Sequence, residues 1–293
     1  MYKSLNEHLK ERFKTKVYKI ALSSGCTCPN RDGTAGVGGC IFCAESGSGD
    51  FAQDAKLPVK EQIKLAKERV SAKNKGGKYI AYFQSFTNTY GKVEHLEPKF
   101  REAMEDEEVV VLSIATRPDC LSEDILAMLQ RLNAVKPVWV ELGLQTIHER
   151  TAQYIRRGYP LEVYDEAVCK LHEIGIEVIT HVIIGLPGES KEDMLSTVRY
   201  VVQGKVEGIK LQLLHVLEGT DLAEDYAKGY FQTLEMDEYI DIIKACVEEI
   251  PTSTVIHRLT GDGSKKSLIA PLWSADKKRV LNALNKALER KGM

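Results

Sequence analysis

Residues 23–49 read SSGCTCPNRDGTAGVGGCIFCAESGSG, a glycine-rich segment that directly follows an apolar run. Four of the seven cysteines lie within it, and this clustering favours metal binding or catalysis over disulfides. Cys40 and Cys43 form C-x2-C, a spacing at which two thiolates converge on one ion or cluster. Using Cys26 and Cys28 as well can close a tetrahedral zinc site. Using three cysteines leaves one iron of a [4Fe-4S] cluster without a protein ligand.

Outward from this segment, short β-rich runs alternate with longer amphipathic stretches, the pattern of a parallel α/β sheet. The predicted strands are 17–23, 78–83, 109–115, 138–144, 177–184 and 208–214. The predicted helices between them are 59–73, 97–104, 122–132, 161–173 and 191–203. After residue 220 the pattern becomes helical, at 235–249 and 275–290, with one short strand at 254–259. We therefore expect a barrel in residues 1–220 that contains the cysteine segment 24–49, and a C-terminal extension, 221–293, packed on it.

Composition excludes several classes of protein. The 293 residues carry 40 basic and 42 acidic side chains, so the chain is no general polyanion binder. No apolar run reaches membrane-spanning length, and residues 1–14 lack the hydrophobic core of a signal peptide. We expect a cytoplasmic protein with no membrane partner. Both ends of the sequence are basic, so a positive surface is expected where they meet.

Six motifs, in order along the chain, carry a resemblance: TCPNRDGT (27–34), YFQSFTNTY (82–90), TRPDCL (116–121), ELGLQT (141–146), GLPGE (185–189) and HRLTGD (257–262). Together with Cys28-x11-Cys40-x2-Cys43 and Phe42 before the last cysteine, they resemble the radical S-adenosylmethionine (radical SAM) superfamily. Within it they are similar to the YtqA/YhcC-type group, which is related to the catalytic subunit of Elongator. The resemblance implies a partial (β/α)6 TIM-like barrel of the radical SAM type with a helical C-terminal cap.

The same resemblance implies two cofactors. Cys28, Cys40 and Cys43 are expected to hold a [4Fe-4S] cluster, whose open iron binds S-adenosyl-L-methionine and yields a 5′-deoxyadenosyl radical. The usual spacing is C-x3-C-x2-C, so the eleven-residue gap is a departure that is characteristic of this group. Cys26 is a second departure, interpreted as a non-ligand, with the alternative that it ligates in place of Cys28. The four-cysteine zinc site is the other alternative.

Cofactor contacts also follow from the resemblance. Arg157 is expected to bind the cofactor carboxylate because a planar guanidinium recognises it bidentately. Gln145 lies on the same face of its strand as Glu141, and the resemblance implies that this face looks into the barrel and that Gln145 contacts the cofactor. His181 is a candidate ribose or substrate contact, although a histidine on a strand is more often a core residue. The remaining predicted contacts are Gln84, Ser85 and Thr87 at the methionyl group and Gly185 and Pro187 at the adenine; Arg258 and Asp262 point to the substrate side by position only.

The resemblance implies chemistry on RNA, at the C5 substituent of the wobble uridine of tRNA, with an electron donor such as flavodoxin or ferredoxin. No catalytic residue is assigned. We expect tRNA phosphates to contact a basic surface beside the barrel mouth, formed by Lys14, Lys16, Lys278 and Arg279. The alternatives are a radical SAM enzyme that acts on a small metabolite and a zinc-stabilised interaction protein.

Overall fold

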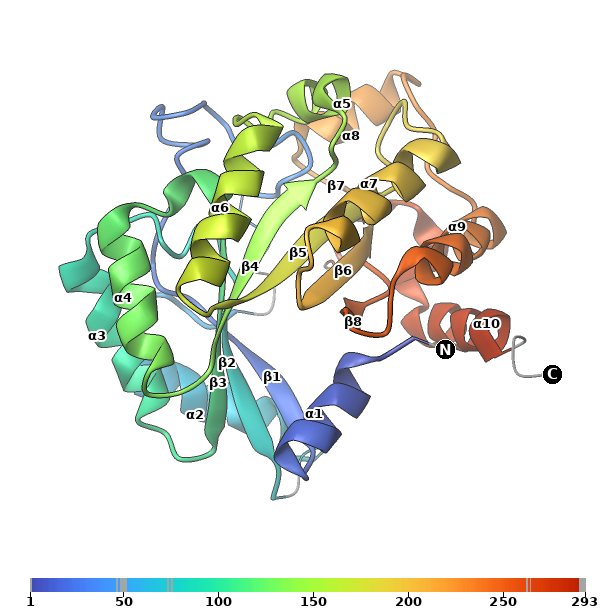
Figure 1. Cartoon of the computed structure of the whole chain (residues 1–293). Coiled ribbons are helices and arrows are strands. Elements are labelled where there is room, and N and C mark those ends of the chain that lie inside the picture. The colour runs from blue at the N-terminus through green and yellow to red at the C-terminus, as the bar shows by residue number, and fades with distance from the viewer. Residues whose placement is uncertain are drawn as a thin grey trace.

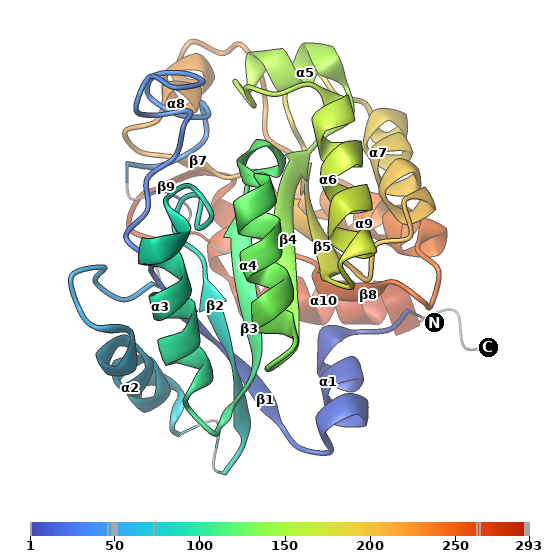
Figure 2. The same ribbon diagram turned by 60° about the vertical axis from the view of Figure 1, so that its left-hand side comes forward.

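The computed structural model describes residues 2–45, 47, 52–72, 74, 76–261, 263 and 265–289 (Figure 1). Parts of the cysteine segment, at 46 and 48–49, and the candidate Asp262 lie outside the described residues. A parallel sheet curves through the molecule, and helices cover its outer face (Figures 1 and 2). The fold is therefore the α/β half-barrel that the sequence predicts.

Seven parallel strands form the main sheet in the order β1-β2-β3-β4-β5-β6-β8. They are β1 (Val17–Leu22), β2 (Lys78–Phe83), β3 (Val109–Thr116), β4 (Val138–Gln145), β5 (Glu177–Ile184), β6 (Gly208–Leu213) and β8 (Val255–Arg258). The sequence places the last of these in the C-terminal extension. In the structure β8 instead pairs in parallel with β6 and becomes the seventh strand of the barrel sheet.

Amphipathic helices connect successive strands and pack on the outside of the sheet (Figure 2). They are α2 (Val59–Val70), α3 (Val93–Met104), α4 (Glu123–Asn133), α6 (Leu161–Glu173) and α7 (Lys191–Gln203), with α9 (Met236–Glu249) before β8 and α10 (Lys277–Glu289) after it. The core between the sheet and these helices is apolar, built from one face of each strand, such as Leu112, Val140 and Leu211.

Shorter elements surround the two ends of the barrel. The helix α1 (Leu5–Phe13) precedes β1, and its capping box at Ser4 and Glu7 fixes where it begins. The other short elements are α5 (Glu149–Tyr154), α8 (Asp221–Ala227), the 3-10 turns Pro118–Cys120 and Leu272–Ala275, and an antiparallel pair of β7 (Val216–Leu217) and β9 (Leu268–Ala270). The predicted helix list contains none of α1, α5 and α8.

Two layers of side chains fill the inside of the barrel. The lower one, which we call the apolar layer, consists of Leu9, Ile80, Val111, Trp139 and Ile179. Above it, toward the carboxyl ends of the strands, hydrogen bonds and ion pairs join a second set that we call the charged layer: Lys19, Tyr82, Ser113, Glu141, His181 and Lys210. Because side chains alternate along a strand, the same strands supply both layers and the outer core.

The helix α1 covers the end of the barrel opposite the cysteine segment (Figures 1 and 2), and its Leu9 belongs to the apolar layer. The basic residues in and just before α1 are partly neutralised, because Lys3 pairs with Glu11 at 2.7 Å and Arg12 pairs with Glu177 at 2.6 Å. The first residues do lie beside α10 in both views. However, the expectation that both basic ends border the barrel mouth is wrong, because α1 lies at the other end.

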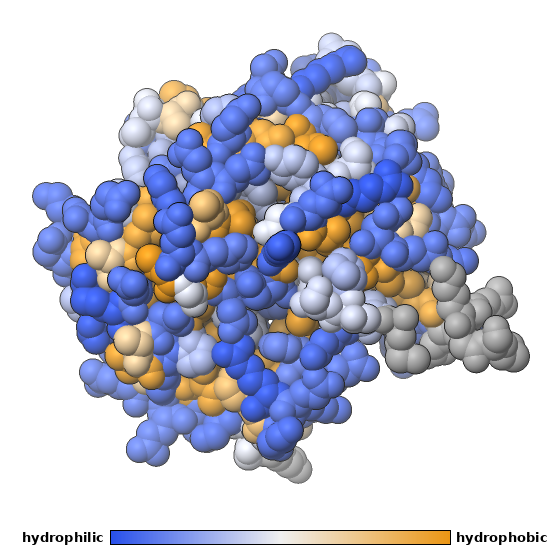
Figure 3. All heavy atoms as spheres, viewed as in Figure 1, coloured by the Kyte–Doolittle hydropathy of each residue, from blue (hydrophilic) through white to orange (hydrophobic). Residues whose placement is uncertain are grey.

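The outer surface carries hydrophilic residues over most of the face in Figure 3, with apolar colour mainly in the furrows between helices. Among the described helices, none is long and apolar enough to cross a membrane.

Candidate functional site

A cavity of about 240 Å³ opens at the carboxyl ends of the barrel strands. In parallel barrels this end carries the chemistry, because the loops that follow the strands converge there. The cysteine segment and the loops after β6 and β8 form its upper wall, and the charged layer forms its floor. Among the predicted site residues, those that line the cavity are Cys28, Cys40, Cys43, Gln84, Thr87, Gln145, Arg157 and His181.

The three cysteines lie on a loop that side chains hold in place. Asn30 donates from Nδ2 to the backbone oxygen of Arg156 at 2.5 Å and contacts Cys40 Sγ at 3.5 Å. Arg31 donates to the backbone oxygens of Cys43 at 3.0 Å and Ala44 at 2.5 Å. The loop is thereby fastened both to itself and to the segment after α5. Thiols from two parts of the chain, 28 and 40–43, thus face one space.

The thiol environment differs between the cysteines. Burial, reinforced by the neighbouring Cys43, raises the pKa of Cys40 to about 12, so a cationic group is needed to hold its thiolate. Cys26 instead packs against the outer core and does not line the cavity. Among the described residues, no three His, Cys, Asp or Glu side chains are grouped closely enough for a single metal ion.

Gln145 Oε1 and Arg157 Nη2 are two buried polar atoms at the cavity that make no hydrogen bond among the described residues, and the carboxylate of Glu149 lies 3.7 Å from Arg157 Nη2. Arg157 uses its other donors on backbone oxygens, at 3.0 Å to Tyr159 and 2.6 Å to Thr146. Buried polar groups are normally satisfied, so such atoms indicate a missing partner. A ligand with a carboxylate and an amino group supplies an acceptor for Arg157 and a donor for Gln145, and these residues therefore fit S-adenosyl-L-methionine.

The backbone at the end of β4 explains how Gln145 reaches the cavity. The pairing of β4 with β5 shifts register between Gly143 and Gln145, and Gln145 has a φ of 69°. A bulge of this kind re-aims a side chain at the end of a strand, and a positive φ in a residue other than glycine costs energy. The residue with this strained backbone, Gln145, is therefore one that lines the cavity.

Three predicted contacts lie away from the cavity lining: Ser85, Gly185 and Pro187. Ser85 is buried. The amide of Gly185 donates to Met194 Sδ at 3.3 Å, and a Cβ added at Gly185 would meet Leu234 Cδ1 at 2.9 Å. The position favours glycine because its φ is 89°, and a side chain there would also have to displace the end of Leu234. A role for these three residues in cofactor binding stays a prediction.

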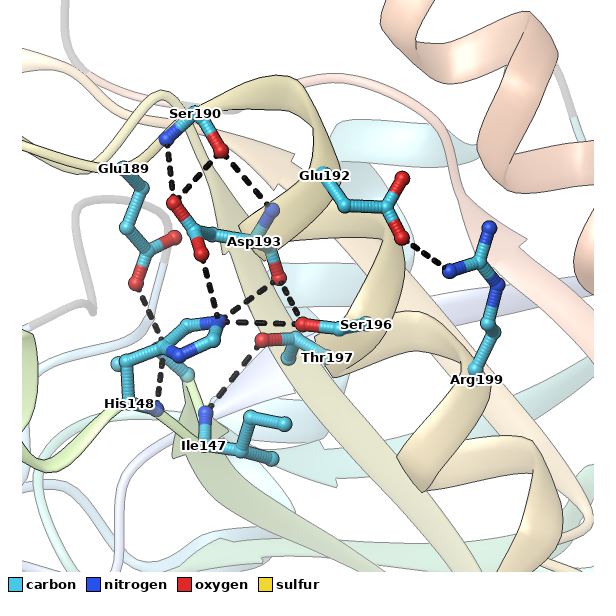
Figure 4. A network of polar contacts seen from close by, with 10 residues as sticks. Ile147, His148, Glu189, Ser190, Glu192, Asp193, Ser196, Thr197 and Arg199 are labelled. Atoms are coloured by element: carbon cyan, nitrogen blue, oxygen red, sulfur yellow. Dashed lines mark hydrogen bonds and ion pairs between the residues drawn. The ribbon is translucent and has the colours of Figure 1, made fainter.

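A polar network ties the end of β4 to the start of α7 (Figure 4). His148 Nε2 lies 2.9 Å from the backbone oxygen of Asp193 and 3.2 Å from Ser196 Oγ. Ser190 caps α7 through Asp193, and Thr146 donates to Glu189 at 2.5 Å. This network holds residues 146–148, which directly follow Gln145, against the start of α7.

Glu141 is at the centre of the charged layer and is fully buried. Its Oε1 accepts from Lys19 at 2.6 Å and Ser113 at 2.7 Å, while its Oε2 accepts from Lys210 and pairs with His181 at 2.7 Å. Sequence reasoning names Glu141 and His181 but misses Lys19 and Lys210. The available signal was their alternation with apolar residues in VYKIAL and GIKLQL.

Comparison with known proteins begins with family models. Residues 24–201 match the model described as the radical SAM superfamily, and residues 206–290 match the model of the radical SAM C-terminal domain. The first match contains the cysteine segment and strands β2–β5, and the second contains β6, β8 and α8–α10.

Among similar sequences, the uncharacterized protein YtqA of Bacillus subtilis is 47% identical over 291 residues, which is 99% of this chain and 90% of that protein. Protein YhcC of Escherichia coli is 33% identical over 97% of this chain and 91% of its own length. A tRNA uridine(34) acetyltransferase of Methanocaldococcus jannaschii is 29% identical over 56% of this chain and 32% of its own. Among solved structures, Elp3 of Methanocaldococcus infernus superposes with a TM-score of 0.72 at 20% identity, covering 94% of this chain and 63% of that one.

Proposed function

The chain belongs to the radical SAM superfamily, and from this premise we propose that it uses a [4Fe-4S] cluster and S-adenosyl-L-methionine to modify the wobble uridine of tRNA. One observation carries the cofactor part: three thiols and two buried polar atoms that make no hydrogen bond face a single cavity at the carboxyl ends of the strands. The RNA part is supported by the tRNA uridine(34) acetyltransferase similarity over about half of the chain.

In this proposal the thiolates of Cys28, Cys40 and Cys43 hold the cluster, one iron each. When bound, the cluster and S-adenosyl-L-methionine supply a 5′-deoxyadenosyl radical by one-electron cleavage of a carbon–sulfur bond. The family match favours this cluster over the zinc alternative. Cys26 is partly buried against the outer core, away from the cavity lining, and has no role in the cluster in this proposal.

The protein's own contribution is to bind, orient and exclude water. Arg157 Nη2 and Gln145 Oε1 bind the two polar groups of the cofactor's methionine end, and the backbone oxygens that Arg157 contacts keep its guanidinium fixed. Gln84 and Thr87 line the same wall. Below them the charged and apolar layers close the lower end of the barrel. Solvent is therefore excluded from the cavity on that side.

The loop after α8 offers an RNA contact near the cysteine segment. The helix α8 is held to that segment, because the Leu222 amide donates to the Ile41 oxygen at 2.9 Å. Just beyond it, Tyr230 is 71% exposed, and the Lys228 ammonium lies 5.8 Å from its ring centroid. An exposed aromatic beside a cation is suited to stack an unpaired base of a tRNA loop.

The cluster assignment is tested with four single variants. After anaerobic reconstitution, Cys28→Ala, Cys40→Ala and Cys43→Ala should lose iron and sulfide, because each removes one thiolate ligand. Cys26→Ala is the matched control and should keep a full cluster. Normal iron content in Cys28→Ala with loss in Cys26→Ala would reverse the assignment.

The cofactor contacts are tested with a pair of adjacent arginines. Arg157→Ala should weaken binding of S-adenosyl-L-methionine by about ten- to a hundredfold, the effect of losing one charge-assisted contact. Arg156→Ala is the control, because Arg156 pairs with Asp221 at 2.5 Å on the surface. Gln145→Ala, which leaves the backbone contacts of Arg157 in place, should also weaken binding. Equal affinity in all four proteins by calorimetry would refute the placement.

The RNA assignment is tested by nucleoside mass spectrometry of tRNA from cells that lack the protein. We expect the wobble uridine in these cells to be altered. In vitro, we expect the purified protein to be active when an electron donor such as flavodoxin or ferredoxin is supplied. In filter binding, Tyr230→Ala should weaken tRNA retention, while Lys14→Glu with Lys16→Glu, at the opposite end of the barrel, should not. Unchanged nucleosides would favour the small-metabolite alternative.

A further inference from the structure

Asn30 lies beside one of the three cavity thiols, in the sequence TCPNRDGT, and only 3% of its surface is exposed. Its side-chain amide nitrogen carries two hydrogens. Nδ2 donates to the backbone oxygen of Arg156 at 2.5 Å and to Cys40 Sγ at 3.5 Å. One buried amide group thus joins the segment after α5 to a thiol that faces the cavity.

The surroundings of Asn30 fix which way its amide points. The Arg156 oxygen is a carbonyl and only accepts, so the NH2 group of Asn30, and not its Oδ1, faces it. On the other side, a Cβ at Gly36 would overlap Asn30 Oδ1, and a Cβ at Gly158 would lie 3.1 Å from it. The backbone oxygen of Asn30 also accepts from the Gly39 amide at 2.7 Å, directly before Cys40. The amide is therefore held with its hydrogens toward Cys40.

The role of this amide changes when the thiol loses its proton. In the thiol form, Cys40 Sγ itself donates to the Arg156 oxygen at 3.5 Å. A thiolate that binds a metal has no proton, so it can only accept. Among the described contacts of Cys40, the donor to its sulfur is then Asn30.

We propose that Asn30 raises the reduction potential of the cluster by donating a hydrogen bond to the sulfur of Cys40. The proposal rests on the proposed function, in which the Cys40 thiolate is a cluster ligand. Reduction transfers one electron from a flavin or iron–sulfur donor protein to the cluster, and no covalent bond forms or breaks in that step. The added negative charge lies in a buried site, and an N–H donor to a ligand sulfur stabilises it. Asn30 acts through Cys40 and is a positioning residue.

The test measures the midpoint potential of the reconstituted holoprotein by redox titration, followed by electron paramagnetic resonance of the reduced cluster. Asn30→Leu keeps the branched shape of the side chain and removes both hydrogens, so the midpoint should shift to a more negative potential. Asn30→Asp places a carboxylate beside the sulfur and should shift the midpoint further in the same direction.

Arg31→Met is the matched control for loosening of the loop. Arg31 also fastens the cysteine segment, by donating to the backbone oxygens of Cys43 at 3.0 Å and Ala44 at 2.5 Å. Its replacement removes these contacts and leaves the hydrogen bond from Asn30 to Cys40 in place, so the midpoint should stay close to that of wild type. No shift in Asn30→Leu, or an equal shift in Arg31→Met, would overturn the proposal.

A second measurement needs no substitution in the loop. Wild-type holoprotein is labelled with nitrogen-15 in the side-chain amides of its asparagines, and pulsed paramagnetic resonance of the reduced cluster should detect a weak coupling to the label. Such a coupling requires an amide in contact with a ligand sulfur, which a purely structural role of Asn30 does not supply. Absence of the coupling in wild type would overturn the proposal even if Asn30→Leu does not hold a cluster.

Iron and sulfide content separate this result from the proposed function. A wild-type protein that holds a full cluster but shows no coupling to the label refutes the role of Asn30 alone. A wild-type protein that assembles no [4Fe-4S] cluster overturns both proposals.

Discussion

Strands β2, β3, β4 and β5 each place one residue in the apolar layer and, two positions later, one in the charged layer. The pairs are Ile80 and Tyr82, Val111 and Ser113, Trp139 and Glu141, and Ile179 and His181. The backbone is shared, so only the side chains distinguish the layers. Fully burying one large apolar side chain contributes about 1.5–3 kcal/mol, whereas a buried ion pair is weak evidence for stability. The apolar layer therefore accounts for folding, whereas stability alone does not explain the charged layer.

The largest effect is expected from removing the one anion of the charged layer. Glu141→Ala leaves Lys19 and Lys210 close together without a counter-ion, so the free energy of unfolding should fall by about 3–5 kcal/mol. Glu97→Ala is the control, because Glu97 also pairs with two cations, Arg101 and Arg131, but does so at the surface. That change should cost less than about 1 kcal/mol. Urea unfolding measures the free energy of unfolding of both variants. Equal losses would show that the buried carboxylate of Glu141 contributes no more to stability than the carboxylate of Glu97.

The next effect depends on pH. Because the pKa of His181 is about 4 in the folded protein, against an ordinary value of 6.5, the unfolded chain binds more protons between these two values. Stability should therefore fall as the pH decreases from 6.5 toward 4, and His181 accounts for up to about 3 kcal/mol of that fall.

His181→Asn removes this contribution, so the variant should lose less stability than wild type between pH 7 and pH 4. The exposed His95 provides a control in His95→Asn, which should follow wild type. Unfolding free energies at three pH values decide the matter. A parallel pH dependence in His181→Asn and wild type would contradict the assignment.

A smaller effect is expected in the apolar layer. Ile80→Val removes one methylene from a fully buried side chain and should cost about 0.5–1.5 kcal/mol. Binding and cleavage of S-adenosyl-L-methionine should be unchanged, because Ile80 does not line the cavity. A loss of S-adenosyl-L-methionine binding in this variant would mean that the two layers do not act separately.

The smallest change in stability is expected when all three charges are replaced at once. Lys19→Met, Glu141→Leu and Lys210→Met together remove both ammonium groups and the carboxylate that they contact, so stability should stay within about 1 kcal/mol of wild type. A loss as large as that of Glu141→Ala alone would indicate that the charged layer stabilises the fold.

The alternation of apolar and polar residues also explains which elements of the fold could be predicted from the sequence. Apolar periodicity predicts β2, β5, α6 and α7 with the bounds that the structure has, because each buries a clear apolar face. The strand predicted at 254–259 is placed in the extension because the pattern around it is helical, whereas in the structure β8 pairs with β6 in the barrel sheet. Lys19 and Lys210 were missed for a related reason: a polar face on a strand normally indicates solvent, and here it faces the inside of a barrel.

The residues of the candidate site also differ in how far the sequence alone could identify them. The C-x2-C spacing indicates Cys40 and Cys43 because ligand geometry is local in sequence, whereas Cys28 follows only from the resemblance. Arg157 and Gln145 were found through the resemblance, and the bulge that aims Gln145 at the cavity could not be predicted from the residues. Gly185 is conformationally demanding, with a φ of 89°, but it packs on Leu234, a residue 49 positions away that no local pattern reveals.

The position of β8 also constrains how the chain folds during synthesis. The strand pairs with β6 on one side, and on the other the Ile256 amide donates to the Lys3 oxygen at 2.9 Å, joining segments about 250 residues apart in the sequence. Contacts this distant form late, because the intervening chain must first be ordered. While the ribosome is still making the C-terminal part, the edge of β6 has no partner strand. A nascent chain in this state exposes a row of unpaired backbone groups, which is the feature that makes folding intermediates prone to aggregate.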